Sequence, residues 1–150
     1  STTAGSYALI DNLPAKDSEV ARRLREAGVV VLGKNNLSQF AGFRTTSAFN
    51  SSTVGGGAFN PYNIENSTCG SSSGSGVASA ASFAAAAIGT ETDGSIICPS
   101  SMMGLVGLKP TIGLIPRTHI VPISHSQDTA GPMAKTQAPG FHRLTVGGTA

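Results

Sequence analysis

The chain has 150 residues, of which only 12% are charged, and a formal net charge of +2 at pH 7. Its ten basic residues are mostly scattered along the chain, which argues against a nucleic-acid-binding protein. It contains no uninterrupted apolar stretch of about 18 residues, so no membrane-spanning helix is predicted.

The first predicted element is a helix that runs from Asp17 or Ser18 to about Ala27. Either side chain can cap the free amides of a first helical turn, and the apolar residues that follow recur at helical spacing. Gly28 is expected to end this helix in the left-handed conformation. The β-branched run of residues 29–32 then predicts a short buried strand, as in a layered α/β fold.

A short helical turn is predicted over Asn35–Phe43, followed by a long surface loop over Arg44–Ser73. The loop is dominated by glycine, serine, threonine and asparagine. Because about thirty residues of loop are unusual inside a compact domain, this segment is either a linker or a loop packed around an active site. Its own sequence does not decide between the two.

The next predicted element is a helix of small residues, Gly74–Ala87, which we expect to be buried on several sides. A strand is expected at Ile88–Thr90. A turn leading into a short helix is expected at Gly94–Met103. A second strand at Leu105–Leu108 ends before Pro110.

The two cysteines, Cys69 and Cys98, form neither a CxxC pair nor a cluster with histidines. The sequence therefore argues against a structural zinc site. A disulfide between them is permitted by the sequence but not required by it.

Two short motifs suggest other functions. Gly28–Asn35 approaches a phosphate-binding loop, but it ends in asparagine rather than serine or threonine, and its centre consists of strand-forming residues. Gly70–Gly74 fits a nucleophile elbow around Ser72, yet no strand precedes it, as such an elbow requires. A triad of Ser72, Asp128 and His142 is therefore a second interpretation only.

Two serine clusters, residues 71–75 and Ser95, carry the main functional signal. Gly94 precedes Ser95 in a turn that opens a helix, and such a turn can direct several N–H groups toward one point, as in an oxyanion hole. A serine there could act as a nucleophile, with a second hydroxyl relaying its proton to a lysine. Glu91 and Asp93 are poor candidates for the base, because an ionised carboxylate is weakly basic.

Taken together, these segments resemble the amidase signature family. The family pattern combines a Gly/Ser-rich run, a small-residue helix, a G-T-[DE]-x-G-G-S-I turn and a G-L-K-P-T strand. In this chain the matching segments are Gly70–Ser75, Val77–Ala87, Gly89–Ile96 and Gly107–Thr111. Further matches at Thr2–Leu9, Gly33–Phe40 and Gly131–Thr136 extend the resemblance to about nine-tenths of the chain.

The resemblance implies an α/β fold in which helices cover a mixed β-sheet. We expect residues 1–136 to form a partial amidase signature domain and residues 137–150 to form a divergent, unstructured tail. On this interpretation the chain is truncated at both ends.

The resemblance also assigns catalytic roles. Ser95 would be the nucleophile that forms an acyl-enzyme, and Ser71, joined to Gly70 by a cis peptide bond, would relay its proton. The amides expected to form the oxyanion hole are those of Thr92, Asp93, Gly94 and Ser95. The base of the family is a lysine upstream of the segment that matches Thr2–Leu9, so it is not in this chain.

Three lysines of the chain are weak candidates to replace that base. Lys34 matches a different family segment, and Lys16 has no better claim. Lys109 lies in the G-L-K-P strand, where a structural role is expected.

The chain departs from the family pattern beside the expected site. Cys69 and Asp93 each replace a glycine, and Ile97 replaces an arginine. An Asp93 carboxylate would repel a developing oxyanion unless it points away from it.

The implied activity is hydrolysis of a non-peptide C–N bond in a small-molecule amide, without a metal or organic cofactor. Transfer of glutamine-derived ammonia on a tRNA, as in the amidotransferase members of the family, is a less favoured activity. The alternative is an inactive truncated product or a non-catalytic remnant, because loss of a general base removes about 10²–10⁴ in rate. Exposed core residues would then favour homo-oligomers or aggregation.

Overall fold

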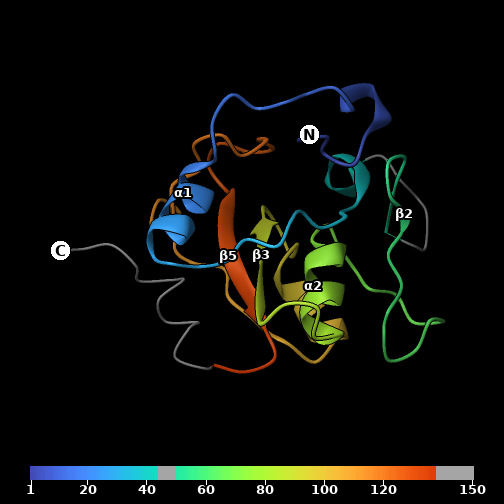
Figure 1. The fold of residues 1–150 in the computed structure, drawn as a ribbon. Coiled ribbons are helices and arrows are strands. Elements are labelled where there is room, and N and C mark those ends of the chain that lie inside the picture. The colour runs from blue at the N-terminus through green and yellow to red at the C-terminus, as the bar shows by residue number, and fades with distance from the viewer. Residues whose placement is uncertain (44–49, 138–150) are drawn as a thin grey trace.

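The computed structural model describes residues 1–43 and 50–137. At its centre is a three-stranded antiparallel sheet in the order β3–β5–β4 (Figure 1). Its strands are β3 (Ala86–Glu91), β5 (Thr129–Ala134) and β4 (Val106–Gly107). The predicted combination of a β-sheet with covering helices is confirmed, and every pair among the described strands is antiparallel.

The middle strand, β5, is buried at all six positions and was not predicted as a strand. Gly131 and Pro132 in its centre are residues that strands usually avoid. Pro132 still accepts a hydrogen bond through its carbonyl from the Leu108 amide, at 3.1 Å. A Cβ at position 131 would collide with the Leu108 carbonyl oxygen, so the close approach of the two chain segments requires glycine there.

Two short helices, α2 (Ser73–Ala80) and α3 (Ile97–Met102), adjoin this sheet. Small residues let α2 approach closely, and the Ser79 hydroxyl donates to the Met133 carbonyl at 2.9 Å. The prediction of a helix as far as Ala87 was wrong. The chain turns at Ser82, which has a φ of 60°, because the last residues of the predicted helix pair with β5 as part of β3.

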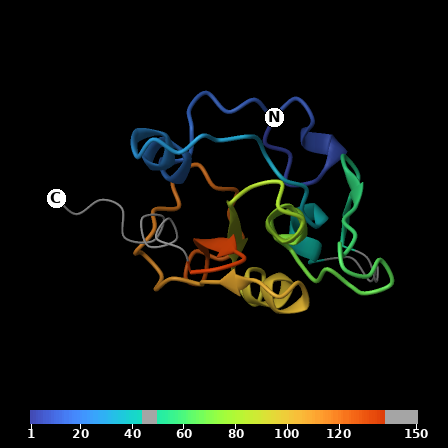
Figure 2. The same ribbon diagram turned by 60° about the horizontal axis from the view of Figure 1, so that its bottom comes forward.

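The first predicted helix is confirmed as α1 (Glu19–Glu26). The Ser18 hydroxyl caps it by accepting from the Ala21 amide at 3.2 Å, and Gly28 follows with a φ of 81°. Figures 1 and 2 show α1 on the opposite side of the sheet from α2.

The strand predicted directly after α1 was wrong. Residues 29–32 are not a strand, and Val30 and Leu32 are 79% and 73% exposed. A buried strand needs a partner for its backbone groups, and none of the described strands pairs with this segment. Its β-branched composition alone therefore could not make it a strand.

The predicted loop between the first and second halves of the chain is packed against the protein in its described part. It contains a small hairpin of β1 (Ser51–Ser52) and β2 (Gly56–Gly57). Asn60 is 2% exposed, and its side chain donates to the Met102 carbonyl at 3.2 Å. These contacts favour the packed-loop interpretation over a linker.

Two 3₁₀ turns complete the described elements, η1 (Tyr7–Leu9) and η2 (Gln39–Gly42). The second falls within the helical turn predicted over Asn35–Phe43. In the ranges that the structure describes, no helix has the length and apolar character needed to cross a bilayer.

Candidate active site

The two serine clusters lie side by side in the structure. The backbone amide of Ser72 donates a hydrogen bond to the Ser95 carbonyl at 3.2 Å. Ser71 and Ser95 are 4% and 9% exposed, and the peptide bond between Gly70 and Ser71 is cis. The turn before α2 and the turn between β3 and α3 thus meet, although 24 residues separate Ser71 from Ser95 (95 − 71).

The Ser72 hydroxyl fastens the beginning of α2 to β3. It donates to the Thr90 carbonyl and accepts from the Thr90 amide, both at 3.0 Å. One turn further along α2, the Ser75 hydroxyl donates to the Ile88 carbonyl at 2.8 Å. Ser72, which precedes α2, and Ser75, within it, therefore bind backbone groups of β3 that a neighbouring strand could otherwise have bound.

The alternative triad of Ser72, Asp128 and His142 is not assembled in the described structure. The Ser72 hydroxyl is engaged with Thr90, and the Asp128 carboxylate accepts from the Thr92 hydroxyl at 2.6 Å instead. His142 lies outside the described residues.

The turn from Thr92 to Ser95, expected to bind an oxyanion, contains a left-handed glycine and, in the described chain, several free amides. Gly94 has a φ of 76°, a left-handed value that favours glycine, and Asp93 is an exposed residue. Within the described part of the chain, the amides of Thr92, Asp93 and Ser95 donate to no other residue. Within the described residues these three amides therefore have no protein acceptor.

The buried carboxylate of Glu91 holds the backbone at the end of this turn. Its side chain is 5% exposed, and one carboxylate oxygen accepts from the amides of Ile96 and Ile97 at 2.7 and 2.9 Å. Burial alone would raise the pKa of Glu91, but the hydrogen bonds from Ile97, Ile96 and Gly94 and the charge of Lys109 outweigh it, so the pKa is lowered. An ionised Glu91 therefore caps the start of α3.

The sequence did not predict this role of Glu91, which was considered only as a base. Its position offered a signal, since an acidic residue shortly before a predicted helix is suited to hold free amides at the helix start. Lys109, by contrast, has the structural contacts expected of it: its ammonium donates to the Thr92 carbonyl at 2.6 Å and lies 3.6 Å from Glu91.

Lys34, the lysine of the G-K-N-N segment, is held elsewhere. Its ammonium donates to the Ser1 carbonyl at 2.8 Å and to the Thr2 hydroxyl at 2.6 Å. No hydrogen bond connects a lysine to Ser71 or Ser95 in the part of the chain that the structure describes.

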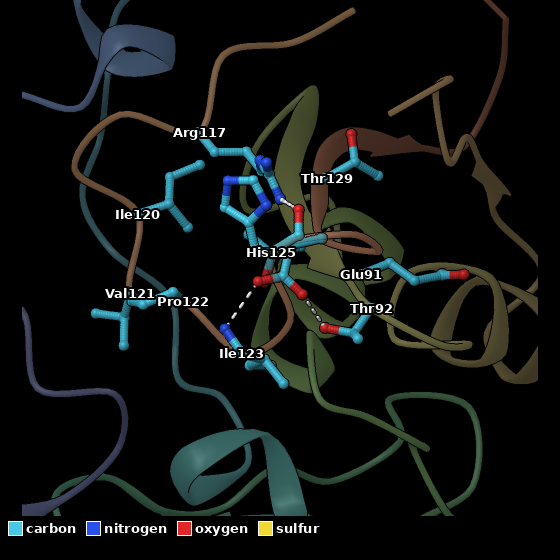
Figure 3. A pocket seen from close by; sticks show the side chains of 11 residues that line it. Glu91, Thr92, Arg117, Ile120, Val121, Pro122, Ile123, His125 and Thr129 are labelled. Atoms are coloured by element: carbon cyan, nitrogen blue, oxygen red, sulfur yellow. Dashed lines mark hydrogen bonds between the residues drawn. The ribbon is translucent and has the colours of Figure 1, made fainter. Parts of the chain in front are cut away.

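A cavity of about 310 Å³ is lined by residues that lead into the turn, Thr90, Glu91 and Thr92. Figure 3 shows the loop of residues 120–123 facing Thr92 and Thr129 across it, while the Glu91 side chain extends away. Neither Ser71 nor Ser95 lines this cavity.

Asp128 joins that loop to the turn by accepting from the Ile123 and Ser124 amides as well as from Thr92. Burial alone would raise the pKa of Asp128, but these hydrogen bonds and the charge of Arg117 outweigh it and lower the pKa. The carboxylate is thus fully used in holding backbone and hydroxyl groups.

A metal centre is not found in the described ranges, where no three histidine, cysteine or acidic side chains are grouped to hold an ion. Cys69 and Cys98 form a disulfide with a Cα–Cα distance of 5.8 Å, which settles the pairing that the sequence left open. Because Cys69 precedes Gly70 and Cys98 lies in α3, this bond joins the two serine-bearing segments a second time.

Comparison with known proteins gives a consistent result. The model of the family described as Amidase matches residues 1–138. A putative amidase of Arthroderma benhamiae is 48% identical over 97% of this chain and 25% of its own length. A glutamyl-tRNA(Gln) amidotransferase subunit from a Marinomonas species is 42% identical over 95% of this chain and 29% of its own length.

Solved structures show the same similarity. Native peptide amidase from Stenotrophomonas maltophilia superposes with a TM-score of 0.91 at 54% identity, covering 99% of this chain and 31% of that one. An amidase family protein from Bacillus anthracis str. Ames gives a TM-score of 0.89 at 42% identity, covering 99% of this chain and 30% of that one. The chain thus spans about a quarter to a third of the length of these relatives.

The lowered pKa of Glu91 predicts a loss of stability in acid. A carboxylate whose folded pKa lies below its ordinary value of 4.5 stabilises the fold above that pH, and the contribution is lost as the pH falls through the folded pKa. We expect Glu91→Gln to lower the free energy of unfolding by about 2 kcal/mol at neutral pH and to lose less stability than the parent between about pH 5 and pH 3.

Urea unfolding at each pH measures this difference, with Glu65→Gln, at an exposed position, as the control. Equal acid losses in the parent and in Glu91→Gln would contradict the role given to Glu91.

Proposed function

The chain belongs to the amidase family, and we propose that it carries the nucleophile and proton relay of a Ser–Ser–Lys amidase site. Ser95 would attack the carbonyl carbon of a carboxylic amide, and its proton would pass through Ser71 to a lysine. The hydrogen bond from the Ser72 amide to the Ser95 carbonyl carries this proposal, because it places the two serine segments together.

The negative charge that develops on the carbonyl oxygen would be stabilised by amides of the turn. We propose the N–H groups of Thr92, Asp93, Gly94 and Ser95 for this role, of which the Gly94 N–H is shared with the Glu91 carboxylate. The lack of other acceptors for three of them in the described chain supports the assignment. The exposed position of Asp93 fits a carboxylate that does not oppose the oxyanion.

In the proposed reaction the C–N bond of the tetrahedral intermediate breaks, and the leaving ammonia or amine takes up a proton. The acyl group remains as an ester on Ser95 and is then transferred to water. No lysine is hydrogen-bonded to Ser71 in the described structure, and the base is proposed to lie outside this chain.

The substrate class is proposed as a carboxylic amide, and the non-peptide bond expected from the resemblance is the first candidate. The name of the Stenotrophomonas maltophilia neighbour, peptide amidase, makes a peptide amide the second. The amidotransferase subunits among the relatives make tRNA-linked ammonia transfer a third, less favoured candidate.

The competing proposal is that this chain is not catalytic. It is favoured by the lack of a hydrogen bond between a lysine and Ser71 in the described residues. An activated phosphonate probe separates the two, applied to the chain as it stands and to a version extended upstream to include the family lysine. We expect Ser95 to be labelled at least about 100-fold faster in the extended version, since a general base contributes about 10²–10⁴.

Ser95→Ala should abolish the labelling of the extended version, and Ser100→Ala should not. Ser100 is a matched control, because it is also buried and lies in α3, where its hydroxyl has no partner in the described structure. Equal labelling of the two versions would show that the base has been misplaced, and labelling that survives Ser95→Ala would contradict the nucleophile.

We also propose that copies of this chain associate through the exposed apolar residues 29–32. The double change Val30→Lys and Leu32→Lys should shift sedimentation toward the monomer. A parent chain that already sediments as a monomer would contradict this proposal.

A further inference from the structure

Thr92 is held at both of its polar ends by residues distant in the sequence. The Lys109 ammonium donates to its carbonyl at 2.6 Å, and its own hydroxyl donates to Asp128 at 2.6 Å. Lys109 follows β4 and Asp128 precedes β5, so two segments of the sheet region converge on this one residue. Thr92 in turn is joined directly to Asp93, whose amide is one of the proposed oxyanion donors.

The planarity of the peptide bond connects these facts. The bond between Thr92 and Asp93 is trans, so its carbonyl and its N–H point in opposite directions. A group that fixes the Thr92 carbonyl therefore also fixes the direction of the Asp93 N–H. The carbonyl accepts from the Lys109 ammonium, and the N–H consequently points away from that ammonium.

We infer that Lys109 is a positioning residue, which holds the Thr92 carbonyl and thereby directs the Asp93 amide at the oxyanion. The inference rests on the proposed function, because it concerns an amide assigned to the oxyanion hole there. Lys109 has no hydrogen bond to Ser71 or Ser95 in the described structure, and its ammonium is already engaged by a carbonyl and by Glu91. It therefore acts through the backbone and not as the base.

The geometry explains why this peptide needs an external hold. Asp93 is exposed, and Gly94 beside it has no atoms within 4 Å of a Cβ position, so packing does not restrain the turn on that side. Without the ammonium, the peptide between Thr92 and Asp93 can rotate and carry the N–H away from the oxyanion. Removal of one oxyanion donor costs about 10²–10³ in rate.

The orientation can be tested in the 150-residue chain itself, independently of activity. We would measure the ¹H–¹⁵N residual dipolar coupling of the Asp93 amide in the parent, Lys109→Met, Lys109→Arg and Lys135→Met. Lys135 is the matched control, since its ammonium donates to one surface hydroxyl, that of Ser82. We expect the Asp93 coupling to change in Lys109→Met alone, while the couplings of β3 stay constant in all four.

The same variants are then compared by the rate at which the phosphonate probe labels Ser95, in whichever version of the chain is labelled. We expect Lys109→Met to lower the maximal labelling rate about 100-fold at unchanged apparent probe affinity, and Lys109→Arg to restore most of it, because a guanidinium can also donate to the carbonyl.

An unchanged Asp93 coupling in Lys109→Met would overturn the inference. A changed coupling with an unchanged labelling rate would overturn it as well, because Lys109 would then orient a group that the reaction does not use. If no version labels Ser95, it is the proposed function that fails, and the Asp93 coupling alone decides whether Lys109 orients this peptide.

Discussion

The arrangement of the site depends on one residue, Ser72, which joins the turn before α2 to strand β3 and to the turn that contains Ser95. Its hydroxyl exchanges two hydrogen bonds of 3.0 Å with the backbone of Thr90, and its amide donates to the Ser95 carbonyl. Gly89 permits this approach, since a Cβ there would lie 2.9 Å from the Ser72 hydroxyl oxygen. The disulfide between Cys69 and Cys98 of α3 joins the same two segments covalently.

Three charged residues packed around the turn, Glu91, Lys109 and Asp128, hold backbone and hydroxyl groups. Glu91 binds the first amides of α3, Lys109 binds the Thr92 carbonyl, and Asp128 binds the Thr92 hydroxyl. Each charge is thereby paired or hydrogen-bonded, as a charge removed from water requires. On the proposed function, the hydroxyls and free amides of the turn are the groups that would meet a substrate.

The sequence predicted the parts of the fold that depend on local signals. The cap at Ser18, the left-handed Gly28 and the turn before Ser95 are set by neighbouring residues, and each lies where it was expected. Elements set by distant contacts were harder to predict. Strand β5 contains a glycine and a proline whose place becomes clear only beside Leu108, and residues 29–32 have strand composition without a described partner.

The same distinction holds for the site. Ser71 and Ser95 could be proposed from glycine and serine spacing, and the position of Glu91 before α3 is itself a local signal. The contacts of Lys109 with Thr92 and Glu91, by contrast, span a tertiary junction that no local pattern encodes. Periodicity indicates how a segment meets its surroundings, and it carries no information about which distant backbone groups a side chain will bind.

The most direct test of this account is amide hydrogen exchange at Ser72 and Thr90, in the parent and in Ser72→Ala. If Ser72 unites the two segments, removal of its hydroxyl will lower the protection of both amides by about 10-fold or more, since about 1.4 kcal/mol corresponds to a factor of ten. Ser75→Ala removes a hydroxyl that joins α2 to Ile88 of β3. This control should leave the Ser72 amide protected. A Ser72 amide that keeps its protection in Ser72→Ala while Thr90 loses its own would contradict the account.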